Sequence, residues 1–350
     1  MRTRSFATVI IAVLILNFAG LAATDDRHRV VKKSQATRLV TLLPASDGVA
    51  VFDAKRFLND ALPKLLSANQ TVLGEIMAKI TEMENRTGID LRKFDQVAVG
   101  VTSKQISPKE TDFEPVAIAS GDISAGALIA IARLASNGTY REENISGHTV
   151  YIFVPKDVAH KAATKTPNSQ VANTIDHVFS TVNKEFAVTA LDKNTLAIGT
   201  LPRVRETLLG QSHVSAELTG LLSQKETAVM SFALRTPDGM AKLVSLDNDD
   251  FGKNIDSIQL LSGSVEVAAI GTTLHLAART KKPDQAQSLK DTLDGLQIIG
   301  KAVFGGSKRP DQQIYGRLIK NAKFDLHGSD VSLDLLIPQA DIDALVAKLK

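Results

Sequence analysis

The first 23 residues constrain the chain most, because their pattern separates them from the part that folds. Arg2 and Arg4 form a basic head, the run Phe6–Phe18 is uncharged and mostly apolar, and small residues follow as far as Ala23. This is the three-part pattern of a secretory signal peptide. We therefore expect cleavage after Ala22 or Ala23 and an exported mature protein, periplasmic or extracellular.

The apolar run is too short for an ordinary membrane span. It covers about 13 residues, whereas a helix that crosses a bilayer needs about 20. A signal segment that is retained as an anchor is the alternative, and only in that case do we expect the protein at a membrane. No cysteine follows the run, which excludes a thioether-linked lipid anchor.

The chain contains no cysteine at all. Disulfides, thiol catalysis and zinc–thiolate sites are therefore excluded together. Because 44% of the residues are hydrophobic, a large core can be buried without covalent cross-links. An exported chain of this size without disulfides is more typical of a bacterial envelope than of an animal secretion.

The charge balance and the aromatic content limit the classes of binding partner that we expect. There are 41 Lys and Arg residues against 38 Asp and Glu residues, a formal charge of +3. This near-neutral balance gives no footprint for a nucleic-acid partner. The chain has no Trp and three Tyr, which also disfavours sugar-stacking platforms and single-stranded nucleic acid.

The chain divides into four parts by pattern: a signal peptide at 1–23, a flexible basic tether at 24–38, one α+β unit at 39–212 and a second at 213–350. Two units agree with an expectation of about 150 residues per domain. We predict the α+β class, with two related units of antiparallel sheet and helices packed on one face of each.

Alternation, helical spacing and turn residues predict the individual elements. A kink is expected at Pro63, a helix end at Gly88, an N-cap at Ser124 and a loop around Pro108. The expected strands are 49–52, 96–102, 115–120, 140–143, 147–154, 186–189, 196–199, 228–235, 258–270, 273–280, 323–326 and 331–337. The expected helices are 55–85, 125–135, 156–163, 171–182, 204–209, 238–246, 283–304 and 339–349.

A strand that runs through a proline into a helix recurs at 151–158, 196–204 and 333–342. Proline suits the first helical turn, where no N–H bond is lost. Longer stretches also correspond: 42–53 with 221–234, 115–134 with 273–303, and 186–209 with 324–345. We interpret this as an internal repeat; the alternative is that unrelated strand–helix corners look alike.

No catalytic signature is found. The histidines are never three or four residues apart, so helical metal spacing is absent. The stretch 247–252 begins like a calcium loop, but Phe251 and Ile258 occupy positions that need oxygen ligands. We predict no catalytic, cofactor-binding or metal-binding residues and no cofactor. The histidines are His28, His148, His160, His177, His213, His275 and His327.

Two very apolar helices, 125–135 and 289–304, could line a lipid-holding cleft or close a core. We favour the core, because amphipathic helices of a sheet-and-helix protein commonly close it. The distinction matters, since a lipid-holding cleft would make the protein a carrier.

Two stretches carry a family resemblance. Residues 43–53 read LPASDGVAVFD, and residues 194–199 read NTLAIG before a short helix that contains Val and Leu. They resemble bacterial exported proteins of unknown function, which have an "LPAD-x-VAVxD" opening after the signal peptide and a later "g-LvvG-x-x-x-V" segment. The resemblance implies an exported α+β protein and brings no activity or site residue with it.

Two functions stay open at this point. The first is a non-enzymatic binding or scaffolding module of the envelope, acting on an apolar ligand or on another envelope protein. The second is a hydrolase whose site assembles only in three dimensions. A cluster of His, Asp and Ser in a deep pocket would favour the hydrolase, and a wide apolar cleft without titratable groups would favour the carrier.

Overall fold

The computed structural model describes residues 35–107, 110–135, 140–153, 185–223, 225, 227–237, 250–307 and 309–347. The predicted signal peptide 1–23, the tether as far as residue 34 and the predicted helices 156–163, 171–182 and 238–246 lie outside these ranges. The chain separates into two compact units. We call residues 33–55 with 76–219 the N-terminal unit, and residues 56–75 with 220–350 the C-terminal unit.

The N-terminal unit contains seven described strands in the order β1-β2-β3-β7-β6-β5-β4, and all pairs are antiparallel. The strands are β1 (Gly48–Asp53), β2 (Phe94–Ser107), β3 (Glu110–Gly121), β4 (Tyr140–Ile145), β5 (His148–Phe153), β6 (Phe186–Ala190) and β7 (Thr195–Thr200). Its helices are α2 (Gln35–Leu42), most of α5 (Gln70–Thr87), the 3-10 turn η2 (Leu91–Lys93), α6 (Ala125–Ala135), α9 (Leu201–Leu209) and the start of α10 (Ala216–Leu221).

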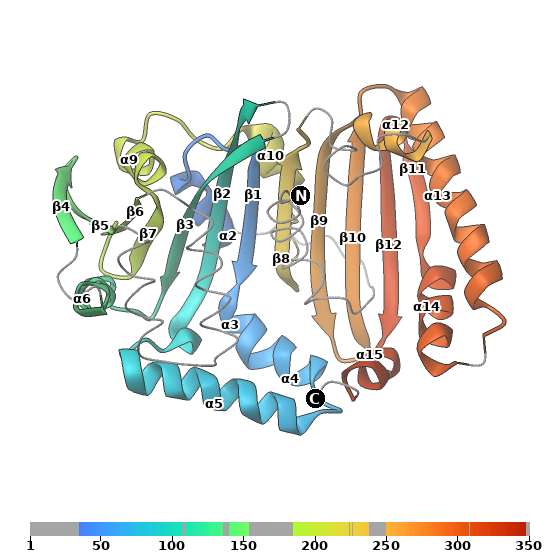
Figure 1. Cartoon of the computed structure of the whole chain (residues 1–350), viewed down its shortest axis with the longest axis horizontal. Helices are drawn as coiled ribbons and strands as arrows, with labels where there is room; N and C mark the ends of the chain where they lie inside the picture. Colours follow the sequence, from blue (N-terminus) through green and yellow to red (C-terminus); the bar gives the residue numbers. More distant parts are fainter. Residues whose placement is uncertain are drawn as a thin grey trace. The chain divides into compact units, whose positions relative to one another are not determined.

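The C-terminal unit contains five described strands in the order β8-β9-β10-β12-β11, again antiparallel. Figure 1 shows α13 and α14 side by side within this unit. The strands are β8 (Ala228–Arg235), β9 (Ile258–Ala268), β10 (Gly271–Thr280), β11 (Lys323–His327) and β12 (Asp330–Pro338). The helices include η1 (Phe57–Ala61, π-helical), α4 (Leu62–Leu65), α12 (Asp250–Asp256), α13 (Pro283–Phe304), α14 (Pro310–Asn321) and α15 (Gln339–Val346).

The α+β prediction is confirmed, and most strands occur where the sequence predicted them. Each unit has a core of its own. In the N-terminal unit, Ile123, Ala125 and Leu196 form one buried cluster at the start of α6. In the C-terminal unit, Leu289 of α13 is buried with Ile258 of β9. Both clusters arise because the apolar stripe of a helix covers alternating side chains of the strands.

The two units share one strand order. Without β4 and β5, the N-terminal order is β1-β2-β3-β7-β6 and the C-terminal order is β8-β9-β10-β12-β11. In each unit a helix follows the third strand along the chain, α6 or α13, and another follows the last strand, α9 or α15. The sequence pairs that suggested a repeat fall on these corresponding elements.

The helix predicted at 55–85 is interrupted. A short helix α3 (Ala54–Arg56) passes into η1 and α4, and α5 begins only at Gln70. Pro63 falls in the first turn of α4, where its missing N–H costs least. The Asn69 side chain then accepts a hydrogen bond from Val72 N at 3.1 Å and starts a new helix. Gly88 does end α5, in a left-handed conformation with φ of 69°.

The loop predicted between the strands at 96–102 and 115–120 is wrong over most of its length. β2 continues to Ser107 and β3 begins at Glu110. Lys104 stands opposite Asp112 in the ladder, and opposite charges directly across two strands favour pairing. The charges that suggested a loop therefore belong to the strands.

Three further points need correction. Helix α14 was not predicted, because its apolar positions are few, although Ile314 is buried. The core role expected for helix 289–304 holds for Leu289 but fails in its second half. Leu296, Ile299 and Val303 are exposed to 48%, 61% and 62%. Helix α2 also begins at Gln35, four positions before the predicted start of the folded part at Leu39.

Candidate functional site

A pocket of about 370 Å³ lies within the N-terminal unit. Three elements surround it: helix α2, the end of strand β3 and the turn between β6 and β7. Arg38 and Leu42 come from α2, Ser120 from β3, and Asp192 and Lys193 from the turn. The lining is mixed in polarity, unlike the wide apolar cleft expected of a lipid carrier.

Asn194 fixes the turn that forms one side of this pocket. Its backbone N–H donates to Asp192 Oδ1 at 2.8 Å, and its side-chain Nδ2 donates to Ile123 O at 3.0 Å. Nδ2 also donates to Gly121 O at 3.3 Å, while the lack of a side chain at Gly121 leaves room for the start of β2, because a Cβ there would lie 2.1 Å from Lys93 O. The backbone N–H of Asn194 therefore closes the turn, and its side chain attaches the turn to the chain just after β3.

Helix α2 forms the opposite wall. Leu39, Val40 and Leu43 are at most 2% exposed and hold one face of the helix against the strands. Arg38 on the same helix is exposed. Burial of these apolar side chains, each worth about 1.5–3 kcal/mol, keeps the helix in place.

Ser120 is the unusual member of the pocket. Its side chain is 6% exposed, and its hydroxyl has no hydrogen-bond partner within the described structure. A buried polar group left in this state costs about 1–3 kcal/mol. The hydroxyl oxygen is closed to solvent, so a ligand would reach it only after a small shift of the lining, and a hydrogen bond formed there would recover that free energy.

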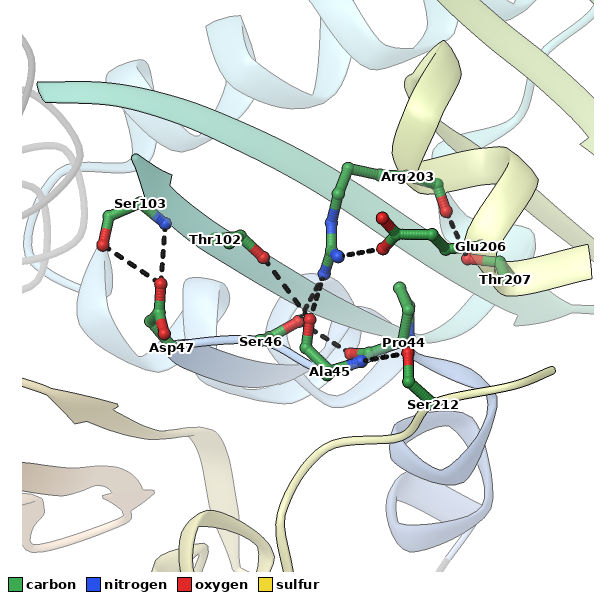
Figure 2. Close-up of polar contacts among 10 residues, drawn as sticks. All are labelled: Pro44, Ala45, Ser46, Asp47, Thr102, Ser103, Arg203, Glu206, Thr207 and Ser212. Atoms are coloured by element: carbon green, nitrogen blue, oxygen red, sulfur yellow. Dashed lines mark hydrogen bonds and ion pairs between the residues drawn. The ribbon is translucent and has the colours of Figure 1, made fainter. Parts of the chain in front are cut away.

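A polar cluster fixes the turn that follows α2, as Figure 2 shows. At its centre is Arg203 of α9, which is 3% exposed. Its Nη2 donates to Ala45 O at 2.7 Å and to Ser46 Oγ at 2.8 Å, and its Nη1 contacts Glu206. Ser46 Oγ in turn donates to Pro44 O at 2.9 Å. We call these contacts the Arg203 clamp.

The other side of the same turn is attached to β2. Asp47 Oδ2 accepts hydrogen bonds from Ser103 N at 2.8 Å and Ser103 Oγ at 3.0 Å. Gly100 on β2 leaves room for Ser46, since a Cβ at this position would lie 2.6 Å from Ser46 Oγ. The turn directly after α2 is therefore held from two directions, and with it the wall of the pocket.

The two stretches that carried the family resemblance meet at this clamp. Residues 43–53 supply Ala45 and Ser46, and Arg203 follows the stretch 194–199 through β7 into α9. Asn194, the first residue of the second stretch, anchors the pocket turn. Sequence reasoning did not identify either role, because Arg203 and Ala45 are 158 positions apart and Asn194 and Ile123 are 71 positions apart.

A second polar cluster lies in the C-terminal unit. His275 Nδ1 contacts Asp334, and His275 Nε2 lies 3.2 Å from Lys225 Nζ and 3.7 Å from Glu266 Oε1. Lys225 Nζ also pairs with Glu266 at 2.9 Å, and Thr227 donates to the same carboxylate at 2.6 Å. The cluster joins strands β9, β10 and β12.

This cluster superficially resembles a hydrolase triad. Ser264, His275 and Asp334 stand opposite one another on three neighbouring strands, which places them on one face of the sheet. A nucleophile, however, needs a hydrogen bond to the free nitrogen of the imidazole. Nε2 of His275 is instead next to Lys225 and Glu266, and Ser264 is buried. The row is a set of polar contacts across the sheet.

The remaining candidates from the sequence are quickly placed. His28, His160 and His177 lie outside the described residues, as does the acidic stretch 247–249. His148 Nδ1 lies 2.9 Å from Ala190 O, which is a structural contact. Over the described ranges, no three or more His, Cys, Asp or Glu side chains are grouped to hold a metal. Within the same ranges, no helix is both long and apolar enough to cross a bilayer.

The fold and the pocket together define an α+β protein of antiparallel strands with a small polar pocket in its N-terminal unit. No family model and no curated protein matches the chain. Three solved crystal forms of the Treponema pallidum protein TP0453 are similar. Form III gives a TM-score of 0.45 at 9% identity and covers 89% of this chain and 98% of its own. Form IV gives 0.44 at 10% identity and covers 90% and 100%. Form I gives 0.41 at 8% identity and covers 88% and 96%. At these values the likeness assigns neither a family nor an activity.

Proposed function

We propose that this protein is an exported, non-enzymatic binding module that holds a small ligand in the pocket beside α2. The observation that carries the proposal is the Ser120 hydroxyl, which is buried at the pocket without a hydrogen-bond partner. Other buried side-chain atoms of the described residues share this state, and the Ser120 hydroxyl differs from them because its residue lines the pocket. A binding role explains this one, because the ligand completes the hydrogen bonding.

The hydrolase alternative has less support in the described residues. The pocket is lined by no histidine, and its serine has no base in contact. The cluster around His275 holds its imidazole between a carboxylate and a lysine rather than next to a serine hydroxyl. Activation of a serine requires such a base within hydrogen-bond reach.

The proposal includes a duplicated architecture, with two related antiparallel units that carry helices on one face. The shared strand order supports it. So does the match between corresponding elements and the sequence pairs: 42–53 with 221–234 falls on β1 and β8, and 186–209 with 324–345 falls on β6-β7-α9 and β11-β12-α15. The hairpin β4-β5 then belongs to the N-terminal unit only.

Export is the part of the proposal that rests on the sequence alone. The basic head, apolar run and small residues before Ala23 support it. N-terminal sequencing of the protein from its source should begin at Ala23 or Thr24. A retained Met1 in a membrane fraction would instead make the protein an anchored scaffold, and an intact precursor in the cytosol would contradict export.

Native mass spectrometry of protein purified from its source tests the binding role. We expect a bound small molecule on the native protein. Leu42→Trp should displace it, because Leu42 lines the pocket and is 37% exposed, which leaves room for a larger ring. Leu209→Trp is the matched control, since Leu209 is similarly exposed at 46% on α9 but does not line the pocket. Absence of ligand, or equal loss in both variants, would contradict the proposal.

A further inference from the structure

We infer that the ligand of this pocket is a small amphiphilic oxyanion, with a carboxylate or phosphate-monoester head and a short apolar tail. The inference rests on the proposed binding function and names its ligand class. It follows from three properties of the lining: an excess of positive charge, an unused hydroxyl and one apolar wall.

Positive charge comes from both sides of the pocket. Arg38 projects from α2 and Lys193 from the β6–β7 turn, and both are exposed. Asp192 is the acid among the lining residues, and its Oδ1 already accepts the Asn194 N–H at 2.8 Å. The lining therefore carries two cations against one carboxylate. An oxyanion placed between the two cations would gain charge-assisted hydrogen bonds.

The Ser120 hydroxyl adds a neutral donor to the same region. A hydroxyl can donate or accept, but a ligand that faces Arg38 and Lys193 is favoured when it carries acceptors. Carboxylate and phosphate oxygens are acceptors with several lone pairs, so one head group can accept from both cations and from Ser120. A neutral head group such as an alcohol would leave the cations without a partner.

The tail follows from α2. Leu39 and Leu42 line the pocket from consecutive turns of that helix, and side chains three apart lie on one face. The volume of about 370 Å³ is at the small end of the roughly 300–1,000 Å³ seen for ligand pockets. A short chain fits this size and this wall, whereas a two-chain lipid does not.

Calorimetry on the purified mature protein, with octanoate, octyl phosphate and octanol as probes, tests the inference. We expect at least one of the anions to bind about tenfold more tightly than octanol, and its binding to weaken as salt is added. The ratio between octanoate and octyl phosphate distinguishes a carboxylate head from a phosphate head.

Charge-removing variants locate the effect. Arg38→Gln and Lys193→Gln should each weaken the anion by roughly three- to tenfold and leave octanol unchanged. Lys104→Gln is the matched control, because Lys104 is an exposed cation of the same unit that does not line the pocket. An equal loss in the control would mean general charge attraction and would overturn the inference.

Failure of the ligand class and failure of the binding role give different results. If octanol binds as tightly as the anions and Leu42→Trp removes it, the pocket binds apolar ligands and only the inference falls. The same holds if a molecule co-purifies but none of the probes binds. If no probe binds and no molecule co-purifies, both the inference and the proposed function are wrong.

Discussion

The corner from β7 into α9 in the N-terminal unit and the corner from β12 into α15 in the C-terminal unit differ in their buried charge. Both corners place a proline at the start of the helix, Pro202 and Pro338. The buried charge of the β7–α9 corner is Arg203, which is 3% exposed. The buried charge of the β12–α15 corner is Asp341, which is 4% exposed. The backbone is thus alike while the charge has opposite sign.

The partners of the two charges explain the difference. Arg203 binds the turn after α2, a segment of backbone carbonyl and hydroxyl groups that need a donor. Asp341 accepts from Arg317 of α14, with Nε at 2.9 Å. The hydrogen bond that Arg317 donates to Asp341 raises the pKa of Arg317 above its ordinary value. Proline and strand therefore form the corner, and the buried charge selects the segment that is attached to it.

The largest effect is expected from Arg317→Ala. It leaves Asp341 as a buried carboxylate without its cation, which should lower the free energy of unfolding by about 3 kcal/mol. Lys320→Ala removes the same charge from an exposed position of α14 and should change stability by less than about 0.5 kcal/mol. Urea unfolding of both variants measures the difference, and equal losses would show that the pair has no special role.

Arg203→Met should cost somewhat less, about 2 kcal/mol, because Ala45 and Ser46 lose a charged donor. The freed carboxylate of Glu206 is 46% exposed and returns to water. Arg205→Met is the control. Arg205 is two residues further along the same helix with a side chain 45% exposed, so its loss should cost less than about 1 kcal/mol. Since the clamp holds the wall of the pocket, Arg203→Met should also weaken ligand binding, whereas Arg205→Met should not. Unchanged binding in both would separate the clamp from the pocket.

Two buried serines, one in each unit, should change the free energy of unfolding in opposite directions when replaced by alanine. Ser231 of β8 is 5% exposed and accepts a hydrogen bond from Ser223 N at 2.7 Å, so Ser231→Ala should destabilise by about 1 kcal/mol. Ser120→Ala removes a hydroxyl without a partner and should stabilise the free protein by about 0.5–1 kcal/mol. Thermal unfolding without ligand decides; a loss of stability in Ser120→Ala would contradict its unpaired state.

The smallest effect concerns acid sensitivity in the N-terminal unit. Asp90 caps η2 and accepts from Arg92 Nε at 2.7 Å, and this hydrogen bond lowers the pKa of Asp90 below its ordinary 3.8. A lowered pKa stabilises the fold above the unfolded value and loses that effect as pH falls through the folded value. Asp90→Asn should therefore lower stability by less than about 1 kcal/mol at neutral pH, and the deficit should shrink towards about pH 3.

Unfolding curves across this pH range measure the effect. Glu75→Gln, at an exposed position of α5, is the control and should show no such pH dependence. A deficit for Asp90→Asn that stays constant with pH would contradict an ionised cap.

The elements that the sequence predicted well are those with local signals. Helix α13 runs from Pro283 to Phe304 as expected, because proline begins it and its apolar residues repeat at helical spacing. Ser124 caps α6, with its Oγ accepting from Ala127 N at 3.3 Å. Helix α14 is more polar overall than α13, and its partly buried Leu318 packs against Ile337 and Ile342. Tertiary packing therefore decides what local pattern could not.

The candidate site was not predictable for the same reason. Arg203 and Arg205 look equivalent in the sequence, yet one is buried and the other exposed. Alternation in β3 indicates that Ser120 faces the interior, but its lack of a partner depends on a turn some seventy positions later. The glycine at Gly100 was the one local signal, since a strand interior loses stability with glycine unless another group approaches closely.

The Arg203 clamp also sets an order of events during synthesis. Ala45 and Arg203 are 158 positions apart, and ribosomes add about 5–20 residues per second. Helix α2 and its turn therefore wait roughly 8–30 seconds before α9 has even been made. During that interval the turn after α2 lacks the donors that Arg203 supplies, so this turn can take its final conformation only late in synthesis.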